Sequence, residues 1–165
     1  MAGCIKELYL ALGSNIDNRI ENILKAISAL RDILEVKKIS TIYESPPWGI
    51  TSQPKFLNCA ILCNADLPPF ELLKEVKSIE KKLGRIQRER WGPREIDIDI
   101  LIYGDLILKT PELEIPHPHL SSRDFFILPL IELSESILHP VYKKPLRDFL
   151  PKESLCTPFA CVLPA

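Results

Sequence analysis

Hydrophobic positions along the chain follow two periods, about two residues for strands and about 3.6 residues for helices. Residues 8–12 alternate and run into Gly13-Ser14-Asn15, which predicts a strand that ends in a turn. Residues 20–30 then carry apolar side chains at helical spacing, and Asp17 or Asn18 can cap that helix.

The same order repeats further along the chain. Residues 36–43 predict a second strand, and residues 56–65, apolar on both sides, predict a third and central one. Pro68-Pro69 opens a second helix that Gly84 ends. Residues 96–100 alternate isoleucine with aspartate, which predicts a fourth strand with one apolar and one acidic face. The series is that of an α+β, ferredoxin-like split βαβ (βαββαβ) fold, an antiparallel sheet with helices on one face and ligand-binding loops on the other.

The C-terminal third gives weaker patterns. Leu106–Leu108 predicts a short strand that extends the sheet, and Ser121-Ser122 can cap a further helix. Pro145–Leu150 predicts a turn or short helix, and beyond Pro151 we expect a loosely held tail. The chain is predicted to be a single domain over residues 1–165, with its core at about residues 5–150.

Composition narrows the class of protein. The 165 residues are 46% hydrophobic and 26% charged, as in one ordinary globular domain. The net charge of -1 provides no overall field that would attract nucleic acid or a membrane. The five cysteines have no metal-binding spacing, and no signal-peptide pattern or membrane-length apolar run occurs. We therefore expect a cytoplasmic protein with no nucleic-acid or membrane partner.

The acidic face of the fourth predicted strand is the strongest candidate for chemistry. Asp97 and Asp99 share it, with backbones about 7 Å apart at ~3.3 Å per residue. Their charges would repel by roughly 0.6 kcal/mol in water but by ~2.4 kcal/mol at an effective dielectric of 20. On an open face a solvated pair is the simpler interpretation, whereas in a cleft Mg²⁺ would relieve the repulsion. Four upstream arginines around Trp91 can match phosphate oxygens: Arg85, Arg88, Arg90 and Arg94.

Other candidates keep two interpretations each. Gly13-Ser14-Asn15 could cradle a phosphate, but an ordinary turn is favoured because neither G-x-x-x-x-G-K-S/T nor G-x-G-x-x-G occurs. His117 beside Arg123 could touch a phosphate or a base, or be an ordinary loop histidine. Asn58 is either a satisfied core amide or a reader of the edge of a planar ring. Trp48 and Trp91 lie in loops with proline and glycine, which suits lids.

Several motifs together resemble one enzyme family. They are Leu10-Ala-Leu-Gly-Ser-Asn15, Ser45-Pro-Pro-Trp-Gly49, Gln53-Pro-Lys-Phe-Leu-Asn58, Arg90-Trp-Gly-Pro-Arg94 through Asp97-Ile-Asp99, and Ile115-Pro-His-Pro-His119 with Arg123. In this order, over about Tyr9 to Leu133, they resemble 6-hydroxymethyl-7,8-dihydropterin pyrophosphokinase. The resemblance implies transfer of pyrophosphate from ATP to the hydroxymethyl group of the dihydropterin, giving the pterin diphosphate and AMP, in folate biosynthesis.

The resemblance also implies site residues. Asp97 and Asp99 would hold two Mg²⁺ ions and, with Arg85 and Arg94, form the catalytic set. Residues implied to contact ATP are Glu80, Arg88, Arg90, Trp91, Arg94, Ile100 through its backbone, His117 and Arg123. Residues implied to contact the pterin are Ser45, Pro46, Trp48, Phe56, Asn58, Trp91, Asp97 and Phe125.

Some features depart from the family pattern. Trp48 stands where an aliphatic residue is familiar, and the arginine-rich loop is one residue shorter, which leaves the roles of Gln87 and Arg88 open. Glu112 and Glu114 stand where some members have a basic and a hydroxyl residue. Two other functions remain as alternatives: an RNA- or nucleotide-binding module, which the acidic strand face disfavours, and a regulatory domain that binds a pterin without catalysis. The chain would act as a monomer or as part of a fused folate enzyme.

Overall fold

The computed structural model describes residues 4–162, which form one main sheet, a two-stranded ribbon and four helices. The elements in chain order are β1 (Lys6–Ser14), α1 (Arg19–Arg31), β2 (Glu35–Ile39), β3 (Ile42–Ser45), β4 (Phe56–Ala65), α2 (Pro69–Lys82), β5 (Asp97–Tyr103), β6 (Leu108–Lys109), β7 (Glu114–Ile115), α3 (Asp124–Leu133), the 3-10 helix η1 (Leu146–Phe149) and β8 (Thr157–Ala160).

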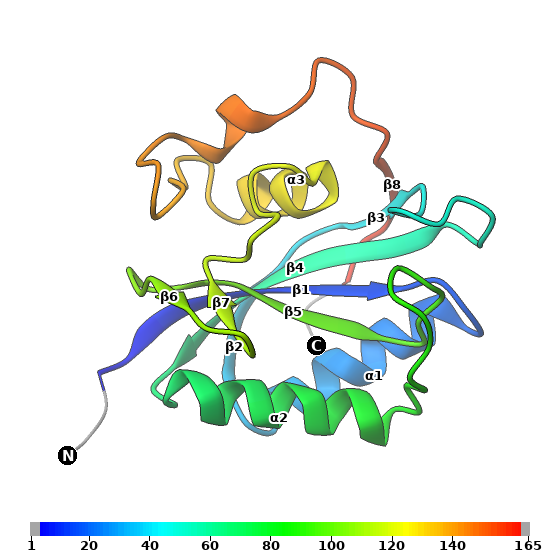
Figure 1. The fold of residues 1–165 in the computed structure, drawn as a ribbon, viewed down its shortest axis with the longest axis horizontal. Coiled ribbons are helices and arrows are strands. Elements are labelled where there is room, and N and C mark those ends of the chain that lie inside the picture. The colour runs from blue at the N-terminus through cyan, green and yellow to red at the C-terminus, as the bar shows by residue number, and fades with distance from the viewer. Residues whose placement is uncertain (1–3, 163–165) are drawn as a thin grey trace.

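The main sheet has the order β5-β1-β4-β3-β8, and β2 pairs with β4 beside β3. All of these pairings are antiparallel. Helices α1 and α2 cover one face of the sheet, as the ferredoxin-like plan predicts, and α3 lies across the other face (Figure 1). The long central strand β4, the N-cap of α1 at Asn18 and the start of α2 at Pro69 match their predicted positions.

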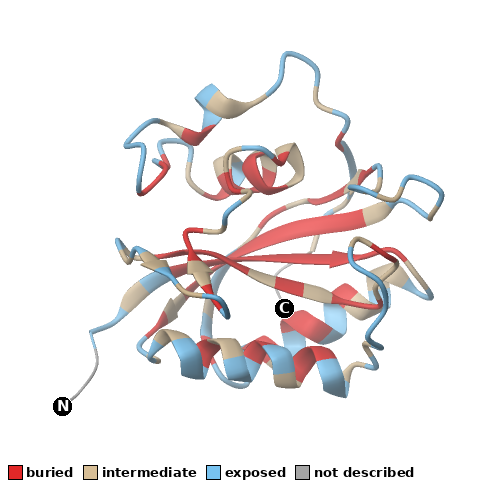
Figure 2. Ribbon diagram, viewed as in Figure 1, coloured by how far each residue is buried: buried red, intermediate tan, exposed pale blue. Residues whose placement is uncertain are grey.

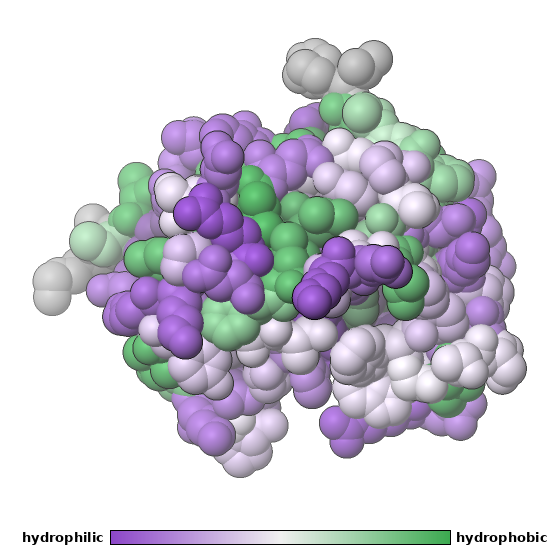
Figure 3. Space-filling model, turned by 90° about the horizontal axis from the view of Figure 1, so that it is seen from above, coloured by the Kyte–Doolittle hydropathy of each residue, from purple (hydrophilic) through white to green (hydrophobic). Residues whose placement is uncertain are grey.

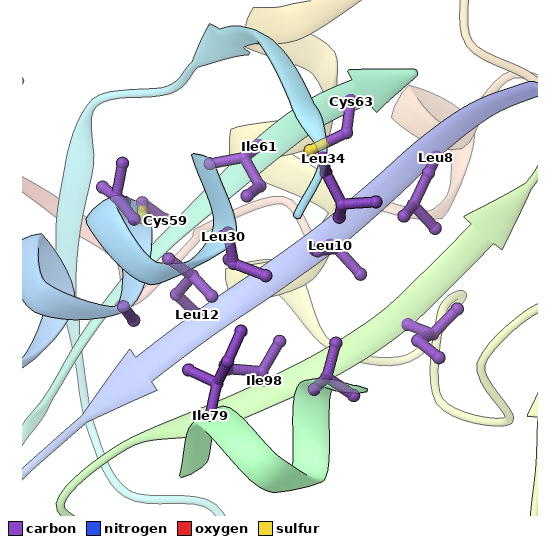
Figure 4. Close-up of a cluster of buried hydrophobic side chains, with 14 of the residues drawn as sticks. Leu8, Leu10, Leu12, Leu30, Leu34, Cys59, Ile61, Cys63, Ile79 and Ile98 are labelled. Carbon is purple, nitrogen blue, oxygen red and sulfur yellow. The ribbon is translucent and has the colours of Figure 1, made fainter. Parts of the chain in front are cut away.

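Both faces of the sheet are buried, which fixes the register of β1. Leu8, Leu10 and Leu12 point into the core under α1 and α2, together with Ile61 and Ile98 from the neighbouring strands (Figure 4). The intervening residues of β1 face α3 instead. Buried residues accordingly run along the central strands, while the helices are buried only on their inward sides (Figure 2). A slip of one residue would exchange the two faces.

Three predicted elements differ from the structure. The strand predicted over residues 36–43 is two strands, because Ser40 interrupts the ladder: the Ala60 N–H donates to its hydroxyl oxygen at 2.9 Å. The strand predicted at Leu106–Leu108 does not extend the main sheet, since β6 pairs with β7 in a separate ribbon. The helix predicted from Ser121-Ser122 begins later, because Arg123 has the extended backbone of an N-cap.

The tail predicted to be loosely held beyond Pro151 is ordered over the described residues. Strand β8 pairs with β3, where Glu44 lies opposite Thr157. Before it, the Ser154 hydroxyl donates a 2.8 Å hydrogen bond to Asp124 at the start of α3. So short a strand leaves no periodicity in the sequence, and its conformation is set by pairing with β3. Within residues 4–162, none of the helices is long and apolar enough to cross a bilayer.

Candidate active site

A cavity of about 280 Å³ lies on the sheet face that carries α3, beside the first turn of that helix. Strands β1, β4 and β5 form its floor, and three loops form its walls. In the view from the α3 side, apolar surface is bordered by hydrophilic side chains (Figure 3). The cavity brings together most of the predicted site residues, which are Ser45, Pro46, Trp48, Phe56, Asn58, Arg90, Trp91, Arg94, Asp97, Asp99, His117, Arg123 and Phe125.

Asp97 and Asp99 both point into this cavity, because the alternation of β5 turns Ile98 and its isoleucine neighbours into the core. Arg85 Nη1 lies 3.1 Å and Arg94 Nη1 3.3 Å from Asp97 Oδ1. Burial and then the charge of Asp99 raise the pKa of Asp97 to about 7, although both arginines act in the opposite direction. The two side chains are 23% and 26% exposed, so the acids are partly shielded from solvent and not fully neutralised by the protein.

Asp99 has a different neighbour, His117. Burial alone would raise the pKa of Asp99, but the nearby imidazole of His117, followed by the charge of Arg123, lowers it on balance. The Nε2 atom of His117 lies 3.7 Å from Asp99 Oδ1. Because the His119 N–H donates to His117 Nδ1 at 3.0 Å, the neutral imidazole carries its proton on Nε2, facing Asp99.

Arg123 is buried among aromatic rings in the same cavity. Its Cζ atom lies 5.1–5.6 Å from the ring centroids of Trp48, Trp91, Phe125 and Phe126. Within the described part of the chain, its Nε atom has no hydrogen-bond partner. Such rings attract a cation through their faces, so this slot suits either the guanidinium or a flat ring.

Asn58, on β4, forms part of the floor of the cavity. Its side-chain amide donates a 2.6 Å hydrogen bond to the Ser45 hydroxyl, and Phe56 lies on the same strand. A Cβ at Gly13 would lie 3.2 Å from the Asn58 oxygen, so the bare backbone of Gly13 leaves that oxygen room. The floor of the cavity thus offers a small polar group in addition to the aromatic rings.

Comparison with known proteins agrees with the geometry of this cavity. Residues 9–135 match the family described as 7,8-dihydro-6-hydroxymethylpterin-pyrophosphokinase (HPPK). The 2-amino-4-hydroxy-6-hydroxymethyldihydropteridine pyrophosphokinase of Aquifex aeolicus is 51% identical over 156 residues, covering 94% of this chain and 97% of the relative. This chain belongs to the HPPK family. The Bacillus subtilis protein of the same name is 40% identical over 78% of both chains.

Other HPPK relatives are longer. Folic acid synthesis protein FOL1 of Dictyostelium discoideum is 44% identical over 81% of this chain but only 20% of its own length. The crystal structure of wild-type HPPK-DHPS from Plasmodium falciparum has a TM-score of 0.70 at 15% identity and covers 89% of this chain and 44% of that one. This structural likeness confirms the predicted ferredoxin-like fold.

Two implied ATP contacts of the HPPK pattern lie outside the cavity. Glu80 is almost completely buried; it accepts a hydrogen bond from the Ile98 N–H at 2.7 Å and forms an ion pair with Arg85 Nη1 at 2.8 Å. The side chain of Ile100 packs into the core under α1 and α2. Glu80 therefore reaches the acidic pair through Arg85.

Arg88 also points away from the cavity. It forms a two-point ion pair with Glu95, whose carboxylate is buried. The Arg88 hydrogen bonds lower the pKa of Glu95 to about 2, against the effect of burial. Both residues belong to residues 85–95, called here the arginine loop, and behind that loop a second cavity of about 410 Å³ is lined by Arg88 and Lys77, among others.

Two amides that were not predicted as site residues, the buried Asn15 and the half-buried Gln53, join three loops around the cavity. Asn15 donates to Gln53 Oε1 at 2.8 Å and to the Pro54 carbonyl at 3.0 Å, and its own oxygen accepts from the Arg94 N–H at 2.8 Å. Gln53 donates to the Trp91 carbonyl at 2.6 Å. Both residues lie inside the family motifs, so the motifs could have indicated that they belong to the site. Asn15 was instead interpreted as part of an ordinary turn.

Proposed function

We propose that this protein transfers pyrophosphate from ATP to the hydroxymethyl oxygen of 6-hydroxymethyl-7,8-dihydropterin and releases AMP, a step of folate biosynthesis. One observation carries the proposal: a single cavity combines the Asp97–Asp99 pair, with arginines beside it, and a slot of aromatic rings. The first suits a polyphosphate with its cations, and the second suits a flat heterocycle.

The aromatic side of the cavity binds the pterin. Phe56 and Phe125 enclose the faces of the ring, and Asn58 pairs with its amide edge, because a carboxamide can both donate and accept. The loop that starts at Ser45 and Pro46 lines the rim with Trp48, and Trp91 closes over the ring. Stacking of this kind is worth about 1–3 kcal/mol per ring in nucleic-acid systems, comparable with the hydrogen bonds.

The acidic side holds the triphosphate. Arg85 and Arg94 both reach Asp97, so their guanidinium groups lie where phosphate oxygens and cations would meet. Arg90, His117 and Arg123 supply further donors along the cavity. The hydroxymethyl oxygen attacks the β-phosphorus, the bond from that phosphorus to the oxygen shared with the α-phosphate breaks, and AMP leaves with that oxygen. Positioning and neutralisation of charge by fixed donors account for most of the catalysis in such transfers.

The residues present fit Mg²⁺. Within residues 4–162 no group of three or more histidine, cysteine, aspartate or glutamate side chains is arranged to hold a metal ion, and Mg²⁺ commonly takes one or two carboxylates with water and phosphate. Burial and mutual repulsion raise the pKa of Asp97, a strain that a bound cation relieves. We propose that Asp97 and Asp99 hold two Mg²⁺ ions, which would neutralise phosphate charge when bound.

The test is incubation with ATP, Mg²⁺ and the hydroxymethyl-dihydropterin while nucleotide products are separated. We expect AMP and not ADP. Asp97→Asn and Asp99→Asn should each lower AMP release by at least a hundredfold, with unchanged circular dichroism. Asp105→Asn, on the exposed turn after β5, is the matched control and should keep wild-type activity. Substantial turnover in both site variants would refute the metal assignment, and pterin binding without AMP would favour a regulatory domain.

The location proposed from the sequence remains the cytoplasm. All five cysteine thiols lie in the described part of the chain and are free. Free thiols agree with a reducing compartment, where ATP is also supplied.

A further inference from the structure

The arginine loop is closed at its base by one buried carboxylate. Glu95 lies just before β5, and its side chain is only 8% exposed. Its two oxygens accept hydrogen bonds from the two terminal nitrogens of Arg88, at 2.8 Å and 2.7 Å. This fork-to-fork geometry is the strongest and most directional form of ion pair available to these side chains.

The same carboxylate also binds the start of the loop. The Ile86 N–H donates to Glu95 Oε1 at 3.3 Å, and Arg88 Nη1 additionally approaches the Pro93 carbonyl at 3.4 Å. Glu95 therefore ties residues 86 and 88, near the beginning of the loop, to residues 93 and 95 at its end. A loop whose ends are joined in this way has fewer conformations available to it.

The clasp has a consequence for the two arginines beside it. Arg85 is adjacent in sequence to Ile86, and Arg94 is adjacent to Glu95. Both place a terminal nitrogen 3.1–3.3 Å from the same oxygen of Asp97. Fixing Ile86 and Glu95 relative to one another thus sets the separation at which Arg85 and Arg94 converge on the acidic pair.

We propose that Arg88 and Glu95 form a positioning clasp for the arginine loop, and that Arg88 is not a phosphate ligand. The inference rests on the proposed function, since it concerns how that site is held. Both terminal nitrogens of Arg88 are committed to Glu95. Arg88 does not line the cavity that holds the acidic pair, and it lines the second cavity together with Arg85 and Arg94. Arg88 acts through its neighbours, as a positioning residue.

The two roles for Arg88 make opposite predictions for Glu95→Gln. This change leaves every arginine in place and removes the charge that holds Arg88. If Arg88 bound phosphate, releasing it would maintain or strengthen ATP binding, and only Arg88→Met would lower activity. The clasp predicts that both variants lower kcat by a similar factor, about tenfold, with less than a threefold change in KM for ATP. The double variant should be no worse than the poorer single one, because each change already breaks the same pair.

A conservative variant separates charge from geometry. Arg88→Lys keeps a cation that could still contact a phosphate, but it cannot form the fork. We expect its kcat to fall between those of the wild type and Arg88→Met. Circular dichroism on each variant checks that the fold is kept. The double variant Arg88→Met/Glu95→Gln leaves no unpaired carboxylate buried in the loop.

Trypsin cleavage of the ligand-free protein tests the clasp without reference to activity. The loop contains several arginines, and Glu95→Gln should speed cleavage within residues 85–94 by about tenfold. Glu21→Gln is the matched control, because it breaks the exposed pair with Lys25 on α1 at 3.0 Å and should leave loop cleavage unchanged. If the wild type forms no AMP, the proposed function fails while this readout still tests the clasp. Equal cleavage in the two variants, or raised activity in Glu95→Gln, would overturn it.

Discussion

Asn15→Asp tests whether the junction of Asn15 and Gln53 positions the arginine loop. The change replaces one NH₂ group by an oxygen and keeps the size and shape of the side chain. In the wild type this NH₂ group uses both hydrogens, on Gln53 Oε1 and on the Pro54 carbonyl. After the change, three oxygens face one another at a residue that is 1% exposed. The Arg94 N–H can still donate to the remaining oxygen.

The expected loss follows from the two acceptors that are left without donors. A buried polar group without its partner costs about 1–3 kcal/mol, so we expect about 2–4 kcal/mol in total, allowing for partial relaxation. For a domain of this size 1 kcal/mol corresponds to roughly 2–4 °C in Tm, which gives a fall of roughly 5–15 °C. Gln53 can recover one bond by turning its amide toward the new carboxylate, but it then loses its 2.6 Å bond to the Trp91 carbonyl.

Loss of that bond should affect catalysis as well as stability. Trp91 has φ +67°, a left-handed conformation that is costly for a bulky residue and needs support from its surroundings. We therefore expect kcat to fall at least tenfold, equivalent to about 1.4 kcal/mol of transition-state stabilisation. The assays are thermal melting followed by circular dichroism, and initial rates of AMP release at saturating substrates.

The control is Asn64→Asp, the same chemical change at the far end of β4, where the amide makes one 3.3 Å bond to Glu35. Near the surface such a change should cost under about 1 kcal/mol and leave kcat unaltered. The reasoning is refuted if the two variants melt alike. It also fails if Asn15→Asp loses stability but retains full kcat, because the junction would then serve the fold alone.

Two further predictions concern Gly49, in the loop after β3, and His139, in the region after α3. Gly49→Ala should lower kcat at least tenfold, because Gly49 has φ +84° and an added Cβ would lie 2.8 Å from Trp91 Cβ. Unchanged kinetics would show that the loop at Gly49 and the arginine loop do not need this close approach. Burial lowers the pKa of His139, so the unfolded chain binds the extra proton first and stability should decline as pH falls below about 6.5. His139→Asn, which keeps an acceptor for the Val141 N–H, should flatten that part of the pH profile in urea melts, and an identical slope in both proteins would contradict the assignment.

Local pattern predicted the elements that carry strong periodicity. The alternation in β5 placed Asp97 and Asp99 on one face and the isoleucines on the other, as the structure has them. The pattern failed at Ser40, where one buried hydroxyl divides a strand, and at Ser121-Ser122, which resemble a cap but precede the true start of α3. At Ser40 a tertiary hydrogen bond ends the strand, and at Arg123 the extended backbone sets the start of the helix. Neither feature leaves a periodic signal in the sequence.

The contacts between loops could not be predicted from the pattern of hydrophobic and polar residues. Asn15 and Gln53 are 38 residues apart, and each alone is a common polar residue in a turn. Likewise, Arg88 was grouped with the other arginines by proximity in sequence, whereas Glu95 directs its side chain behind the loop. Residue type indicated anion chemistry correctly for the stretch, and only the folded loop distinguishes which guanidinium faces the acids.

The pairing of β8 with β3 joins the end of the chain to the wall of the pterin side. Strand β3 finishes at Ser45, which bonds to Asn58, and β8 shields its outer edge. Deleting residues 152–165 would expose that edge of β3 and favour pairing with strands of other molecules. Because Thr157 lies opposite Glu44 and Ala160 lies opposite Ile42, β8 runs away from the Ser45 end of β3, and only its first residues adjoin the wall of the pocket.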